Sequence, residues 1–482
     1  MSVAMEPTPS TELRKGALGL GFIVFFVISA AGPLVAIAGG LPIGIMLGNG
    51  AGTPALLVAT VAILLLFAAG YTAMARHVTN AGGFYAFTAR GLGGTAGGAA
   101  ALIALLGYNT MQIGLYGMFG AVSAGFMATH FGIDAPWWSY SLLALASIAV
   151  FGYRQIDLSA KVLSLLVLGE YVVVLLLDIA ILRAGGKHGI NLTSFTPRAF
   201  LSGTPALGFL FCFATFIGFE ATTIYSEEAK NPQRTVPLAT YISVLLIGAF
   251  YCFSVWCMIV GAGADEIVKT LTSLADPTTF LYSLSDHYAS PALTTAMSVL
   301  FITSVYAGLL AFHNSASRYF YASGREGLLP QSLGRTHPRH GSPHFGSLAQ
   351  SAIAVVVVGL FIAVHADPVL TLFSWLTNLA TLCIIALMTL SSAAVFVYFR
   401  GRPSRDEGVL RVAVFPVLSG IALAVVLILA VANFPLLTGA GATLSYSLTG
   451  LLPVFGIAGA IVARRLRQRD RASYERLGSS RL

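Results

Sequence analysis

Charged residues are scarce in this sequence. Asp, Glu, Lys and Arg make up 10% of its 482 residues, whereas soluble domains carry roughly 25%. Hydrophobic residues make up 56%, and the mean hydropathy is +0.82. The composition therefore excludes an ordinary soluble domain. Backbone N–H and C=O groups inside a membrane must form hydrogen bonds within the protein, as they do in a helix. The apolar composition therefore indicates an all-α polytopic membrane protein.

Cysteine and the common catalytic motifs are also scarce. The glycines at 91–98 follow no strand, and no phosphate-binding loop is present, so nothing indicates a nucleotide site. No nucleophile–base pair is visible. We therefore expect no enzyme activity, no cofactor and no metal site. The cysteines lie inside apolar runs without metal-ligand spacing, and we expect buried thiols at Cys212, Cys252, Cys257 and Cys383.

Long apolar runs fill most of the sequence. A helix needs ~20 apolar residues to cross the hydrocarbon layer, and by this measure we predict about twelve spans. Residues 1–17 and 467–482 are predicted to be polar tails. The spans lie near 18–46, 54–75, 95–129, 137–153, 159–182, 205–229, 236–262, 291–321, 345–364, 369–399, 410–433 and 446–466.

Basic residues are unevenly distributed between the two sides. If the N-terminus lies inside, the outer loops hold only four of the 27 lysines and arginines, namely Arg183, Lys187, Arg198 and Lys269. Because basic loops stay on the cytoplasmic side, we expect a multi-pass protein of the cell membrane with both termini in the cytoplasm. The basic tail after Ala463 is expected to lie against anionic lipids of the bilayer and to bind no nucleic acid.

The span within Phe209–Pro237 does not suit a continuous membrane helix. Gly218 lies in its middle, Glu220 follows at bilayer depth, and the apolar pattern ends at Glu227. A charged residue inside a span marks a functional site by default, and a helix can open only where protein or water satisfies its backbone. We predict an opened helix whose carbonyl oxygens suit a ligand's ammonium group, at Thr215, Phe216, Ile217 and Gly218.

The first span has a similar interruption. Pro33 has no N–H group and clashes with the preceding turn, so the helix should kink or open there. A simple proline kink is the alternative. In an opened helix, the backbone amides of Ala30, Ala31 and Gly32, next to Ser29, would face a ligand's carboxylate at a helix N-terminus.

Two interruptions, in spans one and six, indicate an internal symmetry. The two spans are five positions apart in the series, so residues 18–183 and 205–400 would form two inverted halves of a ten-helix core at 18–400. Residues 409–466 then supply two additional helices. Interruptions at corresponding positions of two halves are typical of a transport site.

Three blocks of sequence resemble those of a known family. The sixth-span block FIGFEATTIYSEEAKNPQRTVP resembles the signature of the amino acid–polyamine–organocation (APC) superfamily of permeases. RHVTNAGGFYAFTARGLGG at 76–94 resembles the family's loop between helices two and three. RYFYASGREGLLPQSLGRTHPRHGSPHFG at 318–346 resembles its loop after helix eight. The blocks follow the family's order, and the similarity spans about 18 to 466.

The resemblance implies a LeuT-like fold, with a five-plus-five inverted repeat and two peripheral helices. It also implies a secondary permease that takes up or exchanges amino acids or related amines by alternating access. A polyamine or other amine permease and a transporter-like sensor stay open as alternatives. The identity of the small-molecule substrate and the oligomeric state also stay open.

Side chains in helices three and eight are candidates for specificity and gating. Asn109 and Gln112 share one face of helix three and would contact the substrate, with hydrogen bonds between helices as the alternative. Family members often carry an aromatic gate six residues before the acid of helix six, where this sequence has Ala214. Phe216 is the substitute candidate for that gate, and Phe312 matches an aromatic residue of the family in helix eight.

Two carboxylates are candidates for proton coupling. Burial raises the pKa of a carboxyl group, so Glu220 and Glu170 are candidate proton carriers, with a structural role as the alternative for each. The helix-five lysine used by some proton-coupled relatives is absent. A sodium site would need hydroxyl groups of helix eight, and Ser304 is expected to lie one turn from the required position.

Overall fold

Helices form all the regular elements in the described part of the chain. The computed structural model describes residues 19–479, except 79, 81, 155–159, 225, 227–228, 339–340 and 401–406. Within these ranges there are helices and no strands, which confirms the all-α prediction. The predicted N-terminal tail 1–17 and Glu227, where the apolar pattern was predicted to end, lie outside the described residues, as do the last three residues of the chain.

The helices follow one another in a single series. The bounds are α1 Leu20–Ala31, η1 Val35–Gly40, α2 Leu41–Leu47, η2 Gly50–Gly52, α3 Thr53–Ala75, α4 Phe84–Leu92, α5 Gly94–Phe131, α6 Trp137–Arg154, α7 Ala160–Arg183, η3 Thr193–Phe195, α8 Pro197–Phe200, α9 Pro205–Ala214, α10 Ala221–Ile224, α11 Pro232–Ala262, α12 Ile267–Ser273, η4 Pro277–Thr279, α13 Phe280–Tyr288, α14 Pro291–Arg325, η5 Gln331–Gly334, α15 His344–Ala363, η6 Pro368–Phe373, α16 Ser374–Arg400, η7 Leu410–Val414, α17 Phe415–Thr438, α18 Ala442–Arg469 and α19 Arg471–Glu475.

Nine helices in the described ranges are long and apolar enough to cross a membrane. They correspond to nine of the predicted spans. The first predicted span is divided between α1, η1 and α2, and the sixth between α9 and α10, while α6 matches the fourth. Every predicted span therefore has a helical counterpart, and spans one and six are the interrupted ones.

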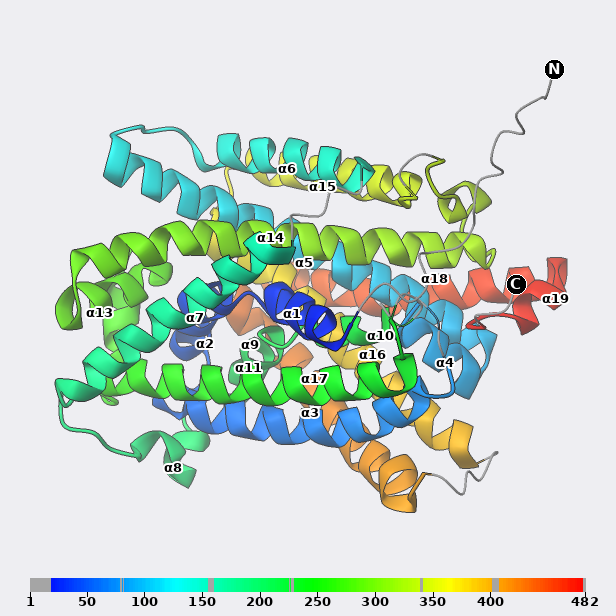
Figure 1. Ribbon diagram of the computed structural model, residues 1–482, viewed down its shortest axis with the longest axis horizontal. Helices are drawn as coiled ribbons and strands as arrows, with labels where there is room; N and C mark the ends of the chain where they lie inside the picture. Colours follow the sequence, from blue (N-terminus) through cyan, green and yellow to red (C-terminus); the bar gives the residue numbers. More distant parts are fainter. Residues whose placement is uncertain are drawn as a thin grey trace.

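The long helices lie side by side along the longest axis of the molecule, as Figure 1 shows. One end carries α4 and α19, and the opposite end carries α8 and α13. Helix α5 runs through the middle and packs against α14, α16 and α18. In the apolar 18-residue stretch of α5, 89% of the residues are buried, whereas the corresponding share in α18 is 17%. Helix α5 is therefore central and α18 peripheral.

Small residues allow close helix packing around α5. A Cβ atom on Gly98 would lie 2.5 Å from the carbonyl oxygen of Gly459, so α5 and α18 approach as closely as their backbones allow. The glycine-rich stretch at 91–98 therefore serves helix packing here. This agrees with the absence of any strand among the described residues that precede it.

The two loops that resemble the family blocks meet at a buried carboxylate. Glu326, directly after α14, accepts a hydrogen bond from Asn80 Nδ2 at 2.9 Å and another from the Tyr85 hydroxyl. The backbone amide of Gly478 also donates to it, at 2.6 Å. The segment after α19 is thereby fixed against both loops at this end of the molecule.

Candidate functional site

The first predicted break lies immediately after α1. The helix continues through Ala31, and Gly32 then adopts φ +54°, a conformation that favours glycine because side chains crowd the backbone there. Pro33 follows and supplies no N–H group. The chain resumes as the π-helix η1, and the next backbone amide after Pro33 is that of Leu34, which donates to Glu170 instead of to a helical carbonyl.

The break is positioned one to two residues later than the sequence suggested. The amide of Gly32 still donates to the carbonyl of Ile28 at 3.2 Å, and Ala30 and Ala31 remain within α1. Their amides are therefore engaged in helical bonds and do not face a ligand. The group released by the break is the Leu34 amide, and the Ala31 carbonyl accepts from the Tyr251 hydroxyl at 3.2 Å.

The second break lies between α9 and α10. Helix α9 ends at Ala214, and the backbone then forms successive turns with hydrogen bonds three residues apart. The Phe219 amide, for example, donates to the Phe216 carbonyl at 3.1 Å. Gly218 has φ +114°, which other residues rarely adopt. The opened segment predicted from the sequence is therefore present.

Glu220 stabilises this second break from within. Its carboxylate accepts from the Gly218 amide at 2.9 Å and from the Tyr108 hydroxyl of α5 at 2.7 Å. The side chain is completely buried. Tyr71 of α3 lies at the same turn, with its hydroxyl 2.5 Å from that of Thr223. The carboxylate thus replaces the helical partner that the opened backbone lacks.

Glu170 on α7 joins three separate segments. It is fully buried and accepts from the Leu34 amide at 3.1 Å and from the Ser304 hydroxyl of α14 at 2.6 Å. A Cβ atom on Gly32 would lie 3.4 Å from that same hydroxyl. Ser304 therefore reaches the first break.

A small cavity lies between the two breaks. It measures about 50 Å³, and a cavity needs ~10–15 Å³ to hold one water molecule. The cavity therefore has room for a few water molecules. The lining comes from both breaks and from α5, α14 and α16, and includes Ala31, Val35, Met111, Ala214, Thr215, Ile217, Phe312 and Thr377.

Several predicted site residues line this cavity and others do not. Ala31, Thr215, Ile217 and the gate candidate Phe312 do so. Phe216, the other gate candidate, is buried and packs edge-on against Tyr251 of α11, with ring centroids 6.3 Å apart. The side chains of Ser29 and Ala30 lie outside the described atoms.

Asn109 and Gln112 take part in hydrogen bonds within and between helices. Asn109 Nδ2 donates to the Leu105 carbonyl at 2.7 Å. Gln112 Nε2 lies 3.2 Å from Nδ1 of His313, and its carbonyl oxygen accepts from Gln350 of α15. Neither residue lines the cavity, so these contacts favour the structural alternative left open for both.

Sequence reasoning missed part of the cavity wall. Thr377 lies on α16, in a span without any local anomaly, so no sequence signal could have selected it. Met111 and Leu115 lie on the α5 face next to Tyr108, at helical spacing, and that spacing was the available signal. Within the described ranges, no group of three or more His, Cys, Asp or Glu side chains could hold a metal ion.

Taken together, these features define a polytopic α-helical membrane protein with two interrupted helices that open on one buried cavity. Comparison with known families is consistent with this class. Residues 19–459 match the model of the amino acid permease family. The chain therefore belongs to the amino acid permease family.

Individual relatives are more distant. The low-affinity putrescine importer PlaP of Escherichia coli is 23% identical over 306 residues, which cover 61% of this chain and 65% of the importer. The branched-chain amino acid permease BcaP of Bacillus subtilis is 28% identical over 332 residues, or 63% and 68% of the two chains. Human cationic amino acid transporter 4 is 34% identical over 161 residues, or 32% and 23%. The match to the putrescine importer thus spans somewhat less than two thirds of its length.

Proposed function

We propose that this protein is a secondary transporter that carries an amino acid across the cell membrane by alternating access. The observation that supports it most is that both interrupted helices border the same cavity. Transporters commonly build their substrate sites from such breaks, because opened backbone supplies polar groups inside an apolar core. The proposed orientation, with both termini in the cytoplasm, rests on the distribution of basic loops.

The walls of the cavity favour an amino acid with an apolar side chain. Met111, Phe211 and Phe312 line it, and none of its described lining residues is charged. A polyamine carries several cationic groups, each costly to bury without an acidic partner. The Escherichia coli relative is nevertheless a putrescine importer, which makes putrescine the second candidate.

Glu170 is the stronger of the two candidates for proton coupling. Its partners Leu34 and Ser304 lie on other segments, so relative movement of these segments must break its hydrogen bonds. An ionised carboxylate only accepts hydrogen bonds, whereas a protonated one also donates. Protonation would therefore alter the contact between α7 and the first break. Exchange of substrates without protons is the competing form of coupling.

Uptake into proteoliposomes tests the proposal. Purified protein is reconstituted and supplied with labelled amino acids and putrescine, with and without an inside-alkaline pH gradient. We expect accumulation of at least one apolar amino acid, and a larger accumulation with the gradient. Uptake of putrescine alone would establish the amine alternative. Binding of an amino acid without any flux would indicate a sensor.

A further inference from the structure

A second concave region, separate from the central cavity, lies towards the end that carries α4 and α19. It is a groove of about 550 Å³ between the end of α3, the first turns of α11 and η7. Three arginines line it, one from each of these elements: Arg76, Arg234 and Arg411. The remaining wall is largely apolar or aromatic and includes Leu238 and Tyr241.

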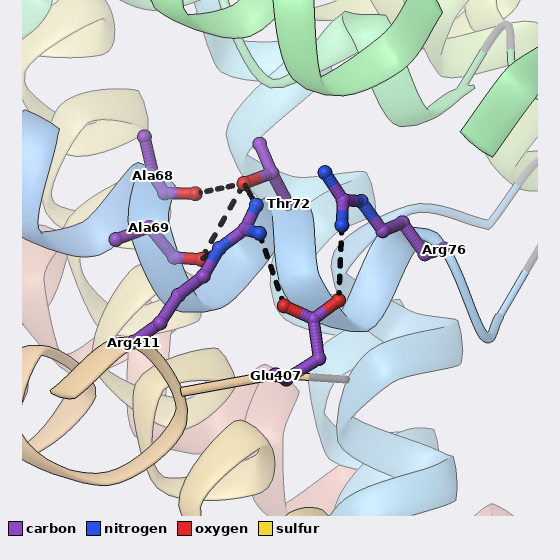
Figure 2. A network of polar contacts seen from close by, with 6 residues as sticks. All are labelled: Ala68, Ala69, Thr72, Arg76, Glu407 and Arg411. Atoms are coloured by element: carbon purple, nitrogen blue, oxygen red, sulfur yellow. Dashed lines mark hydrogen bonds and ion pairs between the residues drawn. The ribbon is translucent and has the colours of Figure 1, made fainter. Parts of the chain in front are cut away.

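Two of the arginines are held in fixed positions, as Figure 2 shows. Glu407 accepts from Nη1 of Arg411 at 3.0 Å and from Nη1 of Arg76 at 3.3 Å. Arg411 also donates through Nε to the Ala69 carbonyl at 3.0 Å and through Nη2 to the Thr72 hydroxyl at 2.9 Å. The guanidinium groups are therefore already ordered, which lowers the entropic cost of binding an anion.

The groove keeps an excess of positive charge. Glu407, whose side chain is 3% exposed, is the one carboxylate that pairs with these arginines among the described residues. Arg234 is exposed and has no ion pair with any described residue. The side chain of Arg76 is 40% exposed. Donors on both sides of the groove thus remain accessible to an anionic group.

An apolar stripe continues from the groove along α11. Leu238 at its edge is 41% exposed, and Leu245, seven residues further, is 51% exposed. Seven residues are two helical turns, so both side chains lie on the same face, roughly 10 Å apart along the axis. A ligand with an anionic head and an apolar chain would fit the arginine-lined groove and the apolar stripe that continues from it.

We propose that the groove binds an anionic phospholipid, with the phosphate on the arginines and an acyl chain along Leu238 and Leu245. Guanidinium groups bind phosphate oxygens in a bidentate manner. In the proposed orientation, this end faces the cytoplasmic leaflet, where anionic lipids concentrate and basic pockets between helices bind their headgroups. The lipid would link α3, α11 and η7 at the membrane surface.

The test measures thermal stability of the full-length protein in neutral detergent while phosphatidylglycerol is titrated. Phosphatidylcholine and inorganic phosphate are titrated in parallel. We expect phosphatidylglycerol to raise Tm in a saturable manner and the other two to have little effect. Arg234→Gln should weaken the apparent affinity about fivefold, the factor that corresponds to ~1 kcal/mol per basic residue at an anionic surface.

Arg90→Gln is the matched control. Arg90 is an exposed arginine of α4 that lies outside the groove, and its substitution removes the same charge. It should leave the titration unchanged. An equal loss in Arg90→Gln would mean non-specific attraction and overturn the proposal. An equal Tm shift with inorganic phosphate would assign the groove to a soluble anion instead, and equal shifts with both lipids would exclude a headgroup site.

Discussion

The two helix breaks satisfy their opened backbone in different ways. At the second break, Glu220 accepts from the amide of Gly218, two residues earlier in the same segment, and from one side chain of α5. At the first break, the Leu34 amide is bound by Glu170, which belongs to α7 and also holds α14 through Ser304. One break is stabilised partly from within its own segment, and the other by neighbouring helices alone.

Under the proposed proton coupling, this difference would make Glu220 a structural carboxylate and Glu170 the one suited to coupling. The hydrogen bond between Glu220 and Gly218 can persist while their segment moves as a unit. The contacts of Glu170 cannot persist if α7, α14 and the first break move relative to one another. Changes at Glu170 should therefore affect conformational exchange, and changes at Glu220 should affect mainly the stability of the second break.

The largest effect is expected from Gly218→Leu. At φ +114° a side chain costs ~1–3 kcal/mol or more in strain, and every ~1.4 kcal/mol corresponds to a factor of ten. Uptake into proteoliposomes should fall at least about tenfold. Gly125→Leu is the control, because Gly125 is a glycine of α5 with no neighbouring atom within 4 Å of an added Cβ. Unchanged uptake in Gly218→Leu would show that the second break is not needed.

Glu170→Gln should have the second largest effect. The substitution keeps an acceptor for Leu34 or Ser304 but cannot change its protonation state. Substrate binding should persist, while the stimulation of uptake by an inside-alkaline gradient should disappear. Paired measurements of equilibrium binding and gradient-driven uptake check this. A normal response to the gradient would remove Glu170 from the coupling mechanism.

Glu220→Gln tests the corresponding carboxylate at the second break. Here we expect the response to the gradient to remain and the protein to be less stable by ~1–3 kcal/mol, since one of two buried donors loses its charged acceptor. Thermal denaturation measures the loss, and uptake with and without the gradient measures coupling. If the gradient response vanishes in Glu220→Gln but not in Glu170→Gln, the roles assigned here are reversed.

Tyr251→Phe should have the smallest effect. It removes the donor to the Ala31 carbonyl at the first break and should cost ~0.5–1.5 kcal/mol of stability, the usual net contribution of one hydrogen bond. Tyr446→Phe is the control, since that side chain is 51% exposed on α18. The two variants are compared by the shift in Tm, and equal shifts would indicate that the first break does not depend on Tyr251.

The sequence predicted the locations of both breaks to within about two residues. Pro33, Gly32 and Gly218 were visible because a missing amide or a required positive φ is a property of single residues. The twelve spans were equally accessible, since each depends on local hydropathy. The spans and the positions of the two breaks could therefore be predicted from properties of single residues and short stretches.

The side chains around the cavity were harder to predict. Phe216 was assigned to the gate, yet it packs against Tyr251, because helical periodicity does not hold through the turns that follow Ala214. The partners of Glu170 lie more than 130 residues away in the chain. Contacts of this kind depend on tertiary packing, and a single sequence contains no direct signal for them.

The most direct test of the shared site is a thermal-shift screen of the twenty amino acids and putrescine on the wild-type protein and on Ala214→Trp. Ala214 lines the cavity between the two breaks, so the indole should fill it. Ala432→Trp, at an exposed position of α17, is the control. We predict that an amino acid raises Tm of the wild type and of Ala432→Trp but not of Ala214→Trp. An undiminished shift in Ala214→Trp would place the substrate elsewhere and contradict the account.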